Sequence, residues 1–276
     1  MTKFVKGRVS VVLTVHNDRE YVHDSIKSIL QQTHRDLELI VVDDGSTDGS
    51  AESVTSISDD RIKLLTPGRI GRGKALNAGI AASTGEFIAI QDSDDLSHPQ
   101  RLEIEARFLK ELNLDLLGAS AILFEDNRVP VWSSIDRAAD SPIDVTGELT
   151  MANPLPHITM MMRRSLMEAL KGYSETRQSF FDYELLIRAA ANGYRLYRIP
   201  ISLAAKRIHL HQYFEKGARA RYALEMLKLQ CTAISTLKKK RWMLPMFPLI
   251  FCYRMMPRSF RMTIQRRRSL YNAPLV

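Results

Sequence analysis

Three largely apolar runs, each followed by polar or acidic residues, constrain the fold of this chain more than any other feature. They cover residues 9–15, 37–42 and 87–90 and are rich in Val, Ile and Leu. Continuous apolar runs indicate strands that are buried on both faces. The segment between the first two runs has apolar residues at helical spacing, which predicts a helix. Strand, helix and strand in this order predict a right-handed parallel crossover and an α/β fold.

The third run delivers three carboxylates, Asp92, Asp94 and Asp95, at its carboxyl end. Open α/β sheets bind ligands beyond this end of their strands. Clustered carboxylates repel one another unless a cation lies among them, and hard oxygen donors suit Mg²⁺ or Mn²⁺ carrying a phosphate. The alternative is a solvated acidic turn that caps the helix after Pro99. The pattern predicts one of these two structures.

A glycine-rich loop at residues 68–74 carries three cationic side chains and opens a helix. Backbone N–H groups and cations at a helix start favour a phosphate ligand. The loop lacks the Gly-Lys-Ser/Thr of a Walker loop, and a dinucleotide fingerprint would follow the first strand. We interpret it as a phosphate cradle, with a flexible linker as the alternative. Asp44, which follows the second strand, is expected at the same sheet edge.

Two later positions have a functional and a structural interpretation each. Asp182 lies in the first turn of a predicted helix, where the helix dipole stabilises a carboxylate and where it could equally act as a general base. His157 is either a structural histidine or a substrate contact. Earlier in the chain, Asp18 is expected to cap the helix after the first strand.

The sequence between residues 196 and 211 predicts two short strands. Residues 196–200 read as an edge strand that ends at a proline. Alternation over residues 206–211 then places Arg207, His209 and His211 on one side of a strand. Such side chains suit a diphosphate and metal site. The alternative is an exposed basic edge strand.

The basic residues gather at the C-terminus. Of 39 Lys and Arg, 11 follow Glu225 and no Asp or Glu does, which leaves 28 basic and 31 acidic residues in 1–225, a net charge of −3. We therefore expect an α/β domain over residues 1–225 and a basic C-terminal region over residues 226–276. The main domain has no basic stripe interleaved with aromatics, so a nucleic-acid partner is not expected.

The C-terminal region contains an apolar run at residues 242–253 between basic flanks. The run is shorter than the roughly 20 residues that span a bilayer, and its prolines break helices. It suits the interface of an anionic membrane, with packing on the main domain or a partner protein as alternatives. Cys231 and Cys252 are expected to be reduced, buried thiols, with a disulfide between them as the alternative. No signal peptide is expected at Met1.

In this order, the motifs resemble those of the family 2 glycosyltransferases of the GT-A fold, an inverting family that uses nucleotide-diphospho-sugars. The resemblance covers about residues 8–215. It rests on five motifs: Val-Ser-Val-Val-Leu-Thr-Val-His-Asn, Val-Val-Asp-Asp-Gly-Ser-Thr-Asp, Gly-x-Gly-Lys-Ala-Leu-Asn-x-Gly, Asp-Ser-Asp-Asp and Phe-Asp-Tyr-Glu-Leu-x-x-Arg.

The resemblance implies a nucleotide site at the first three motifs. Thr14, His16 and Asp44 would line the nucleoside pocket, with Asp44 accepting from the base. Arg72 or Lys74 would reach toward the nucleotide. His16 departs from the family's pattern, because a tyrosine is usual there.

The resemblance also implies which residues take part in the reaction. Asp182 would be the catalytic base. Asp94 would ligate a divalent cation, Mn²⁺ or Mg²⁺, with Asp92 nearer the ribose or sugar. Arg207 and His209 match an element that closes over the diphosphate, and His209 is also a candidate metal ligand.

The expected function is inverting transfer of a sugar from a nucleotide-diphospho-sugar, most simply a UDP-sugar, to a hydroxyl of a saccharide or lipid-linked acceptor in surface polysaccharide or glycolipid synthesis. Phe181 stands where an acid often precedes the base, which bears on acceptor contacts. The alternatives are a sugar-nucleotide-binding protein without transfer activity and a nucleotidyltransferase on the same scaffold. The expected location is the cytoplasm or the cytoplasmic face of the membrane.

Overall fold

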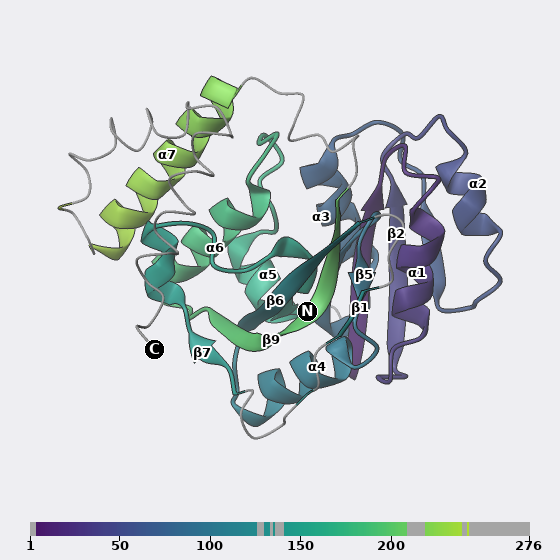
Figure 1. Ribbon diagram of the computed structural model, residues 1–276, viewed down its shortest axis with the longest axis horizontal. Helices are drawn as coiled ribbons and strands as arrows, with labels where there is room; N and C mark the ends of the chain where they lie inside the picture. Colours follow the sequence, from purple (N-terminus) through teal and green to yellow (C-terminus); the bar gives the residue numbers. More distant parts are fainter. Residues whose placement is uncertain are drawn as a thin grey trace, which may run out of the picture. The chain divides into compact units, whose positions relative to one another are not determined.

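The computed structural model describes residues 4–125, 130–132, 135, 141–208, 219–238 and 242. The chain forms two compact units, Met1–Leu210 and His211–Val276. The first unit is built on one nine-stranded sheet with flanking helices (Figure 1). The strands are β1 (Val5–Val15), β2 (Leu37–Asp43), β3 (Ile62–Leu65), β4 (Gly85–Asp92), β5 (Leu96–Ser97), β6 (Leu116–Glu125), β7 (Ile143–Asp144), β8 (Met161–Arg163) and β9 (Tyr197–Ile208).

The helices of this unit connect successive strands or follow them. They are α1 (Val22–Leu30), α2 (Ser50–Thr55), α3 (Arg72–Ala82), α4 (Arg101–Glu111), α5 (Arg164–Leu170) and α6 (Phe181–Ala191), with the short 3-10 turns η1 (Thr146–Thr150) and η2 (His157–Thr159). The predicted α/β fold with strands at the three apolar runs is confirmed.

The sheet is mostly parallel, in the order β3-β2-β1-β4-β8-β6-β9-β5, with β7 beside β9. β3, β2, β1 and β4 are parallel neighbours, and β6 is parallel to β9. The short β8 pairs antiparallel with both β4 and β6, so those two strands point the same way. The carboxyl ends of β1, β2, β4, β6 and β9 therefore face one edge of the sheet.

Helices cover both faces of the sheet. On one face, Leu13 of β1 packs in a cluster with Ile26 of α1 and Leu102 of α4. On the other face, Ile40 of β2 packs with Ala75 of α3. Burial of a Leu or Ile side chain contributes about 1.5–3 kcal/mol. Because both faces are covered, the strands consist of apolar runs without alternation.

The prediction of an edge strand over residues 196–200 is wrong. A single strand, β9, continues through Pro200 and lies between β6 and β5. Its pairing with β6 skips Pro200 and Ile201, between Ile199 and Ser202. A proline has no N–H for the strand ladder, and this shift in register removes the need for one.

The prediction that Asp18 caps the first helix is also wrong. The residue at the N-cap of α1 is Tyr21, which makes no side-chain capping bond. Asp18 precedes a turn, and its carbonyl accepts from the N–H groups of Tyr21 (3.1 Å) and Val22 (3.0 Å). Its carboxylate accepts a hydrogen bond from the hydroxyl of Ser93. Asp18 therefore joins the turn after β1 to the acidic turn after β4.

The second unit contains α7 (Arg219–Leu237), and the compositional boundary at residue 225 falls inside this helix. Cys231 on α7 is a free thiol that is partly exposed, not buried as expected. Cys252 and the apolar run after Trp242 lie outside the described residues. In the described part of the chain, no helix is both long and apolar enough to cross a membrane.

Candidate active site

The ends of β1, β2 and β4 lie side by side. In the parallel register, Thr14 of β1 is directly beside Asp92 of β4 and Val42 of β2. The N–H of Asp44 donates to the carbonyl of Val15 over 2.9 Å. The acidic ends of two strands therefore share one sheet edge, where open α/β sheets bind ligands.

Asp44 anchors the glycine-rich loop to the end of β2. Oδ1 of its buried carboxylate accepts from the N–H groups of Ile70 (2.7 Å) and Gly71 (2.8 Å), and Oδ2 accepts from Nη1 of Arg69 (2.6 Å). Gly45 has a φ of +72°, and a Cβ there would lie 2.8 Å from the nitrogen of Arg69, so glycine is required. Contact of Asp44 with a nucleobase stays a prediction.

Arg72, the first residue of α3, forms an ion pair with Asp92 at the end of β4. His157 approaches the same carboxylate, with Nδ1 at 3.7 Å from Oδ1, and its Nε2 lies 3.0 Å from the hydroxyl of Tyr173. Burial raises the pKa of Asp92, but Arg72 and His157 outweigh it and hold that pKa well below its usual range. Asp92 is therefore ionised at neutral pH.

Asp182 joins this cluster from the first turn of α6. Its Oδ2 accepts from Nδ2 of Asn153 over 2.6 Å. The charge of Asp92, and then that of Asp182, raises the pKa of Arg72; burial, and then Asp182, raises the pKa of Tyr173. Charges act this way only at short range, so Asp182 lies near the ion pair. The front cluster is the set Arg72, Asp92, His157, Tyr173 and Asp182.

Three carboxylates of the acidic turn could hold a metal ion. Side-chain oxygens of Asp92, Asp94 and Asp95 lie within 4.8 Å of one another. Asp95 is fully buried: Oδ1 accepts from the N–H of Arg207 (2.8 Å), and Oδ2 has no hydrogen-bond partner among the described residues. Burial, then the charges of Asp94 and Asp92, raises the pKa of Asp95 well above its usual range. Three hard donors and an orphaned buried oxygen fit Mg²⁺ or Mn²⁺.

Arg207 holds the acidic turn from β9. Its Nε donates to the carbonyl of Asp94 (2.9 Å), and its guanidinium carbon lies 4.7 Å from the ring centroids of both Tyr21 and Phe124. Arg207 is buried, so the alternative of an exposed basic edge strand is wrong at this position. Its contact with a diphosphate stays a prediction, and His209 and His211 lie outside the described residues.

The other residues predicted to contact the nucleotide are Thr14, His16 and Lys74. Thr14 is almost buried beside Asp92, whereas His16 is exposed just beyond the end of β1. Lys74 is exposed on α3 and forms no ion pair within the described part of the chain. Of the two cations that the sequence offered for the nucleotide, the fold brings Arg72 to the carboxylates.

Gln91 fixes the acidic turn through hydrogen bonds to the backbone of that turn. Its Nε2 donates to the carbonyl of Asp95 (2.8 Å), and Oγ of Ser25 (3.0 Å) and the carbonyl of Asp92 (3.3 Å) lie within hydrogen-bond distance of the same nitrogen. Oγ of Ser25 donates in turn to the carbonyl of Asp92 (2.8 Å). A carbonyl only accepts, so the amide nitrogen must face these groups. One side chain thus holds both ends of the turn that carries the metal candidates.

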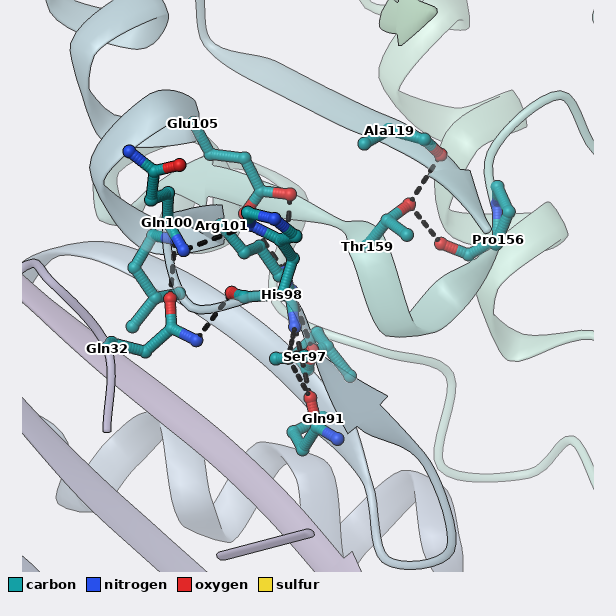
Figure 2. A network of polar contacts seen from close by, with 12 residues as sticks. Gln32, Gln91, Ser97, His98, Gln100, Arg101, Glu105, Ala119, Pro156 and Thr159 are labelled. Atoms are coloured by element: carbon teal, nitrogen blue, oxygen red, sulfur yellow. Dashed lines mark hydrogen bonds and ion pairs between the residues drawn. The ribbon is translucent and has the colours of Figure 1, made fainter. Parts of the chain in front are cut away.

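A buried ion pair supports Gln91 (Figure 2). Oε1 of Gln91 accepts from Nη1 of Arg101 (3.1 Å) and from Oγ of Ser97 (2.8 Å). Nε of Arg101 lies 3.2 and 3.3 Å from the two carboxylate oxygens of Glu105, and both side chains are 0% exposed. Burial raises the pKa of Glu105 to about 7 although Arg101 opposes it. The rear network is the set Gln91, Ser97, Arg101 and Glu105.

The profile of Glycosyl transferase family 2 matches residues 10–170, which is more than half of the chain. This chain belongs to glycosyl transferase family 2. The glycosyltransferase EpsE of Bacillus subtilis is 34% identical over 203 residues, 71% of each chain. An uncharacterized glycosyltransferase of Methanocaldococcus jannaschii is 30% identical over 210 residues, 71% of this chain and 72% of that one. The chain is therefore a glycosyltransferase, as the motif order predicted.

Solved structures share the fold of this family 2 glycosyltransferase. TarS 1-349 of S. aureus in complex with UDP-GlcNAc aligns with a TM-score of 0.64 and 21% identity, over 82% of this chain and 66% of that one. The mannosyltransferase PcManGT of Pyrobaculum calidifontis in complex with GDP-Man and Mn²⁺ aligns with a TM-score of 0.60 and 18% identity, over 96% and 81%. The predicted GT-A fold is confirmed.

Sequence reasoning missed several members of the family 2 site. Arg69 lies inside the glycine-rich loop that the sequence analysis recognised, so a local signal for this residue was present. Asn153 and Tyr173 carried no local signal, because their partners lie 29 and 16 residues away in sequence. Tertiary packing places them: Asn153 meets Asp182 of α6, and the backbone of Tyr173 is hydrogen-bonded to the side chain of Asn77 on α3.

Proposed function

We propose that this glycosyltransferase transfers a sugar, with inversion, from a nucleotide-diphospho-sugar to a hydroxyl of a saccharide or lipid-linked acceptor in surface polysaccharide or glycolipid synthesis. The observation that carries the proposal is the arrangement at the end of β4, where side-chain oxygens of Asp92, Asp94 and Asp95 lie within 4.8 Å of one another and Asp92 pairs with Arg72. The charge of Asp182 also raises the pKa of Arg72, which is consistent with this arrangement. Carboxylates that suit a metal and a carboxylate that suits a base therefore belong to one site.

A UDP-sugar is the first donor to test. TarS, a structural neighbour, has a structure in complex with UDP-GlcNAc, and this supports the choice. PcManGT has one in complex with GDP-Man, which makes a GDP-sugar the second donor to test.

Asp94, with Asp95 and Asp92, would hold Mn²⁺ or Mg²⁺. When bound, the cation would stabilise the negative charge that develops on the departing nucleoside diphosphate. The oxygen donors of the acidic turn and the orphaned Oδ2 of Asp95 support this assignment. Arg72 adds a fixed positive charge beside the same carboxylates. The Mn²⁺ in the PcManGT structure is consistent with it.

Asp182 would act as the general base. As the acceptor oxygen forms its bond to the anomeric carbon, its proton passes to Asp182. The bond from the anomeric carbon to the diphosphate breaks in the same step, and its electron pair leaves with the nucleoside diphosphate. One displacement of this kind inverts the configuration.

The test is Asp182→Asn, which should retain donor binding and lose about 10²–10⁴ in transfer rate. Transfer is measured by nucleoside diphosphate release with panels of UDP- and GDP-sugars and saccharide acceptors plus Mn²⁺, and the product anomer is assigned by NMR. Transfer at the wild-type rate would exclude Asp182 as the base. Donor binding by the wild type without any release would identify a binding protein instead.

A further inference from the structure

The side-chain amide of Asn153 donates a hydrogen bond to Asp182, and its two hydrogen bonds determine its orientation. Oδ1 of Asn153 accepts from the N–H of Leu155 (3.0 Å), and its Nδ2 donates to Oδ2 of Asp182 (2.6 Å). A backbone N–H only donates and a carboxylate only accepts, so a flipped amide would lose both bonds. The short bond therefore has a neutral N–H donor and a carboxylate acceptor.

The segment that carries Asn153 is held in place on the sheet. Pro154 restricts Asn153 to extended backbone, and the carbonyl of Pro154 accepts from Nη1 of Arg198 (3.3 Å). Thr159 donates to the carbonyl of Pro156 (2.8 Å) and lies 3.0 Å from the carbonyl of Ala119 on β6 (Figure 2). The amide of Asn153 thus projects from a fixed segment.

The start of α6 is fixed relative to this segment. Tyr183, which is fully buried, donates its hydroxyl to the carbonyl of Leu149 in η1. Phe180 enters the helix with a φ of 58°, a left-handed conformation that is costly for a bulky residue. Asp182 is therefore held by the packing of Tyr183 on one side and by the amide of Asn153 on the other.

The two oxygens of Asp182 are not equivalent. Oδ2 accepts from Asn153, while no residue in the described part of the chain donates to Oδ1. The donor on Asn153 is a neutral amide, so it holds Oδ2 by a hydrogen bond and forms no ion pair with it. A carboxylate with one oxygen held and one available is the arrangement that a general base requires.

We propose that Asn153 is the positioning residue of the catalytic base, holding Oδ2 of Asp182 so that Oδ1 receives the proton of the acceptor hydroxyl. The inference rests on the proposed function, in which Asp182 is the base. Asn153 touches neither the donor nor the reacting atoms in this role. It determines the direction from which the acceptor hydroxyl is deprotonated.

Asn153→Ala removes the donor and should lower kcat by about 10–10², the size of effect that follows from misplacing a reacting group. The Kd for UDP with Mn²⁺, measured by calorimetry, should stay within twofold of the wild type. Asn192→Ala is the matched control, because Asn192 lies just after the other end of α6 and donates within its own helix (2.9 Å). It should leave kcat unchanged.

Asn153→Asp gives a signature that a merely structural role would not. Two carboxylates would then share one short bond, and such a pair titrates as a unit. With one shared proton it mimics the native bond and should retain activity; without it, repulsion should misplace Asp182. The pH profile of kcat should gain a falling alkaline limb that the wild type lacks. The side chain is nearly isosteric, so this variant should fold even if Asn153→Ala does not.

The outcomes separate the inference from the proposed function. Loss of transfer in Asp182→Asn together with an unchanged kcat in Asn153→Ala, or an unchanged pH profile in Asn153→Asp, would overturn the role of Asn153 alone. Transfer at the wild-type rate in Asp182→Asn would overturn the base itself. If both assignments hold, adding Asn153→Ala to Asp182→Asn should lower the rate no further, because residues that act through one group are not additive.

Discussion

Two arginine–carboxylate pairs flank the carboxyl end of β4, and they differ in what surrounds them. In the rear network, Arg101 and Glu105 are both 0% exposed. In the front cluster, the side chains of Arg72 and Asp92 are 40% and 19% exposed. The rear arginine also donates to Gln91, Ser97 and the carbonyl of Ile90. Nε of Arg72, in contrast, is buried without a partner among the described residues.

The difference in burial indicates that one pair fixes the end of β4 and that the other is available to bind a ligand. A buried ion pair costs much desolvation, and it is retained where hydrogen bonds satisfy its polar atoms. The rear pair meets this condition and fixes the acidic turn through Gln91. The front pair is more open to solvent, so its partners can be exchanged for those of a ligand at lower cost. The rear network should therefore determine stability, and the front cluster should determine binding and transfer.

The largest expected effect on stability follows from Arg101→Met. Removing one member of a buried pair leaves Glu105 buried without its partner, which typically costs about 3–5 kcal/mol of the free energy of unfolding. Urea denaturation followed by circular dichroism measures this loss. Arg101→Met with Glu105→Leu should recover most of it, because no buried charge is then left. If Arg101→Met alone lowered the free energy of unfolding by less than about 1 kcal/mol, as at surface pairs, the two pairs would not differ in their contribution to stability.

A smaller effect is expected from pH, with opposite signs at the two pairs. The pKa of Glu105 is raised from 4.5 to about 7 in the folded protein. Its contribution to stability is therefore fully present below pH 4.5 and is lost as the pH rises to about 7. The lowered pKa of Asp92 contributes stability at neutral pH that is lost on acidification.

Glu105→Gln removes the titrating group of the rear network. The difference in free energy of unfolding between the wild type and this variant should fall steadily from pH 4.5 to pH 7 and level off above it. Denaturation series at several pH values measure the slope. A difference that does not change with pH would mean that Glu105 is not protonated preferentially in the folded state.

The smallest effect on stability is expected at the front cluster. Arg72→Met should change the free energy of unfolding by about 0–1 kcal/mol, as for exposed pairs. Transfer should nevertheless fall by about 10²–10³, the typical cost of losing one group that stabilises developing charge. Lys74→Met is the matched control, two positions along α3, and should preserve both quantities. If the two variants behaved alike, Arg72 would have no special role.

The fold could be predicted in large part because its signals are local. The apolar runs, the crossover helix and the acidic strand ends each follow from a few neighbouring residues. The prediction failed at Pro200, where the sequence suggests a strand end but a shift in register lets β9 continue. It also failed at Asp18, because a turn separates that residue from α1.

For the candidate site, the sequence by itself determined which carboxylates stand at the strand ends, since parallel pairing places those ends at one edge. Tertiary structure alone decided their partners: Arg72 and not Lys74 for Asp92, Gln91 and Arg101 behind the turn, and Asn153 for Asp182. Strand direction follows from short-range pattern, whereas the contact between residues 153 and 182 depends on how distant segments pack. That packing is set by the whole core and by no single motif.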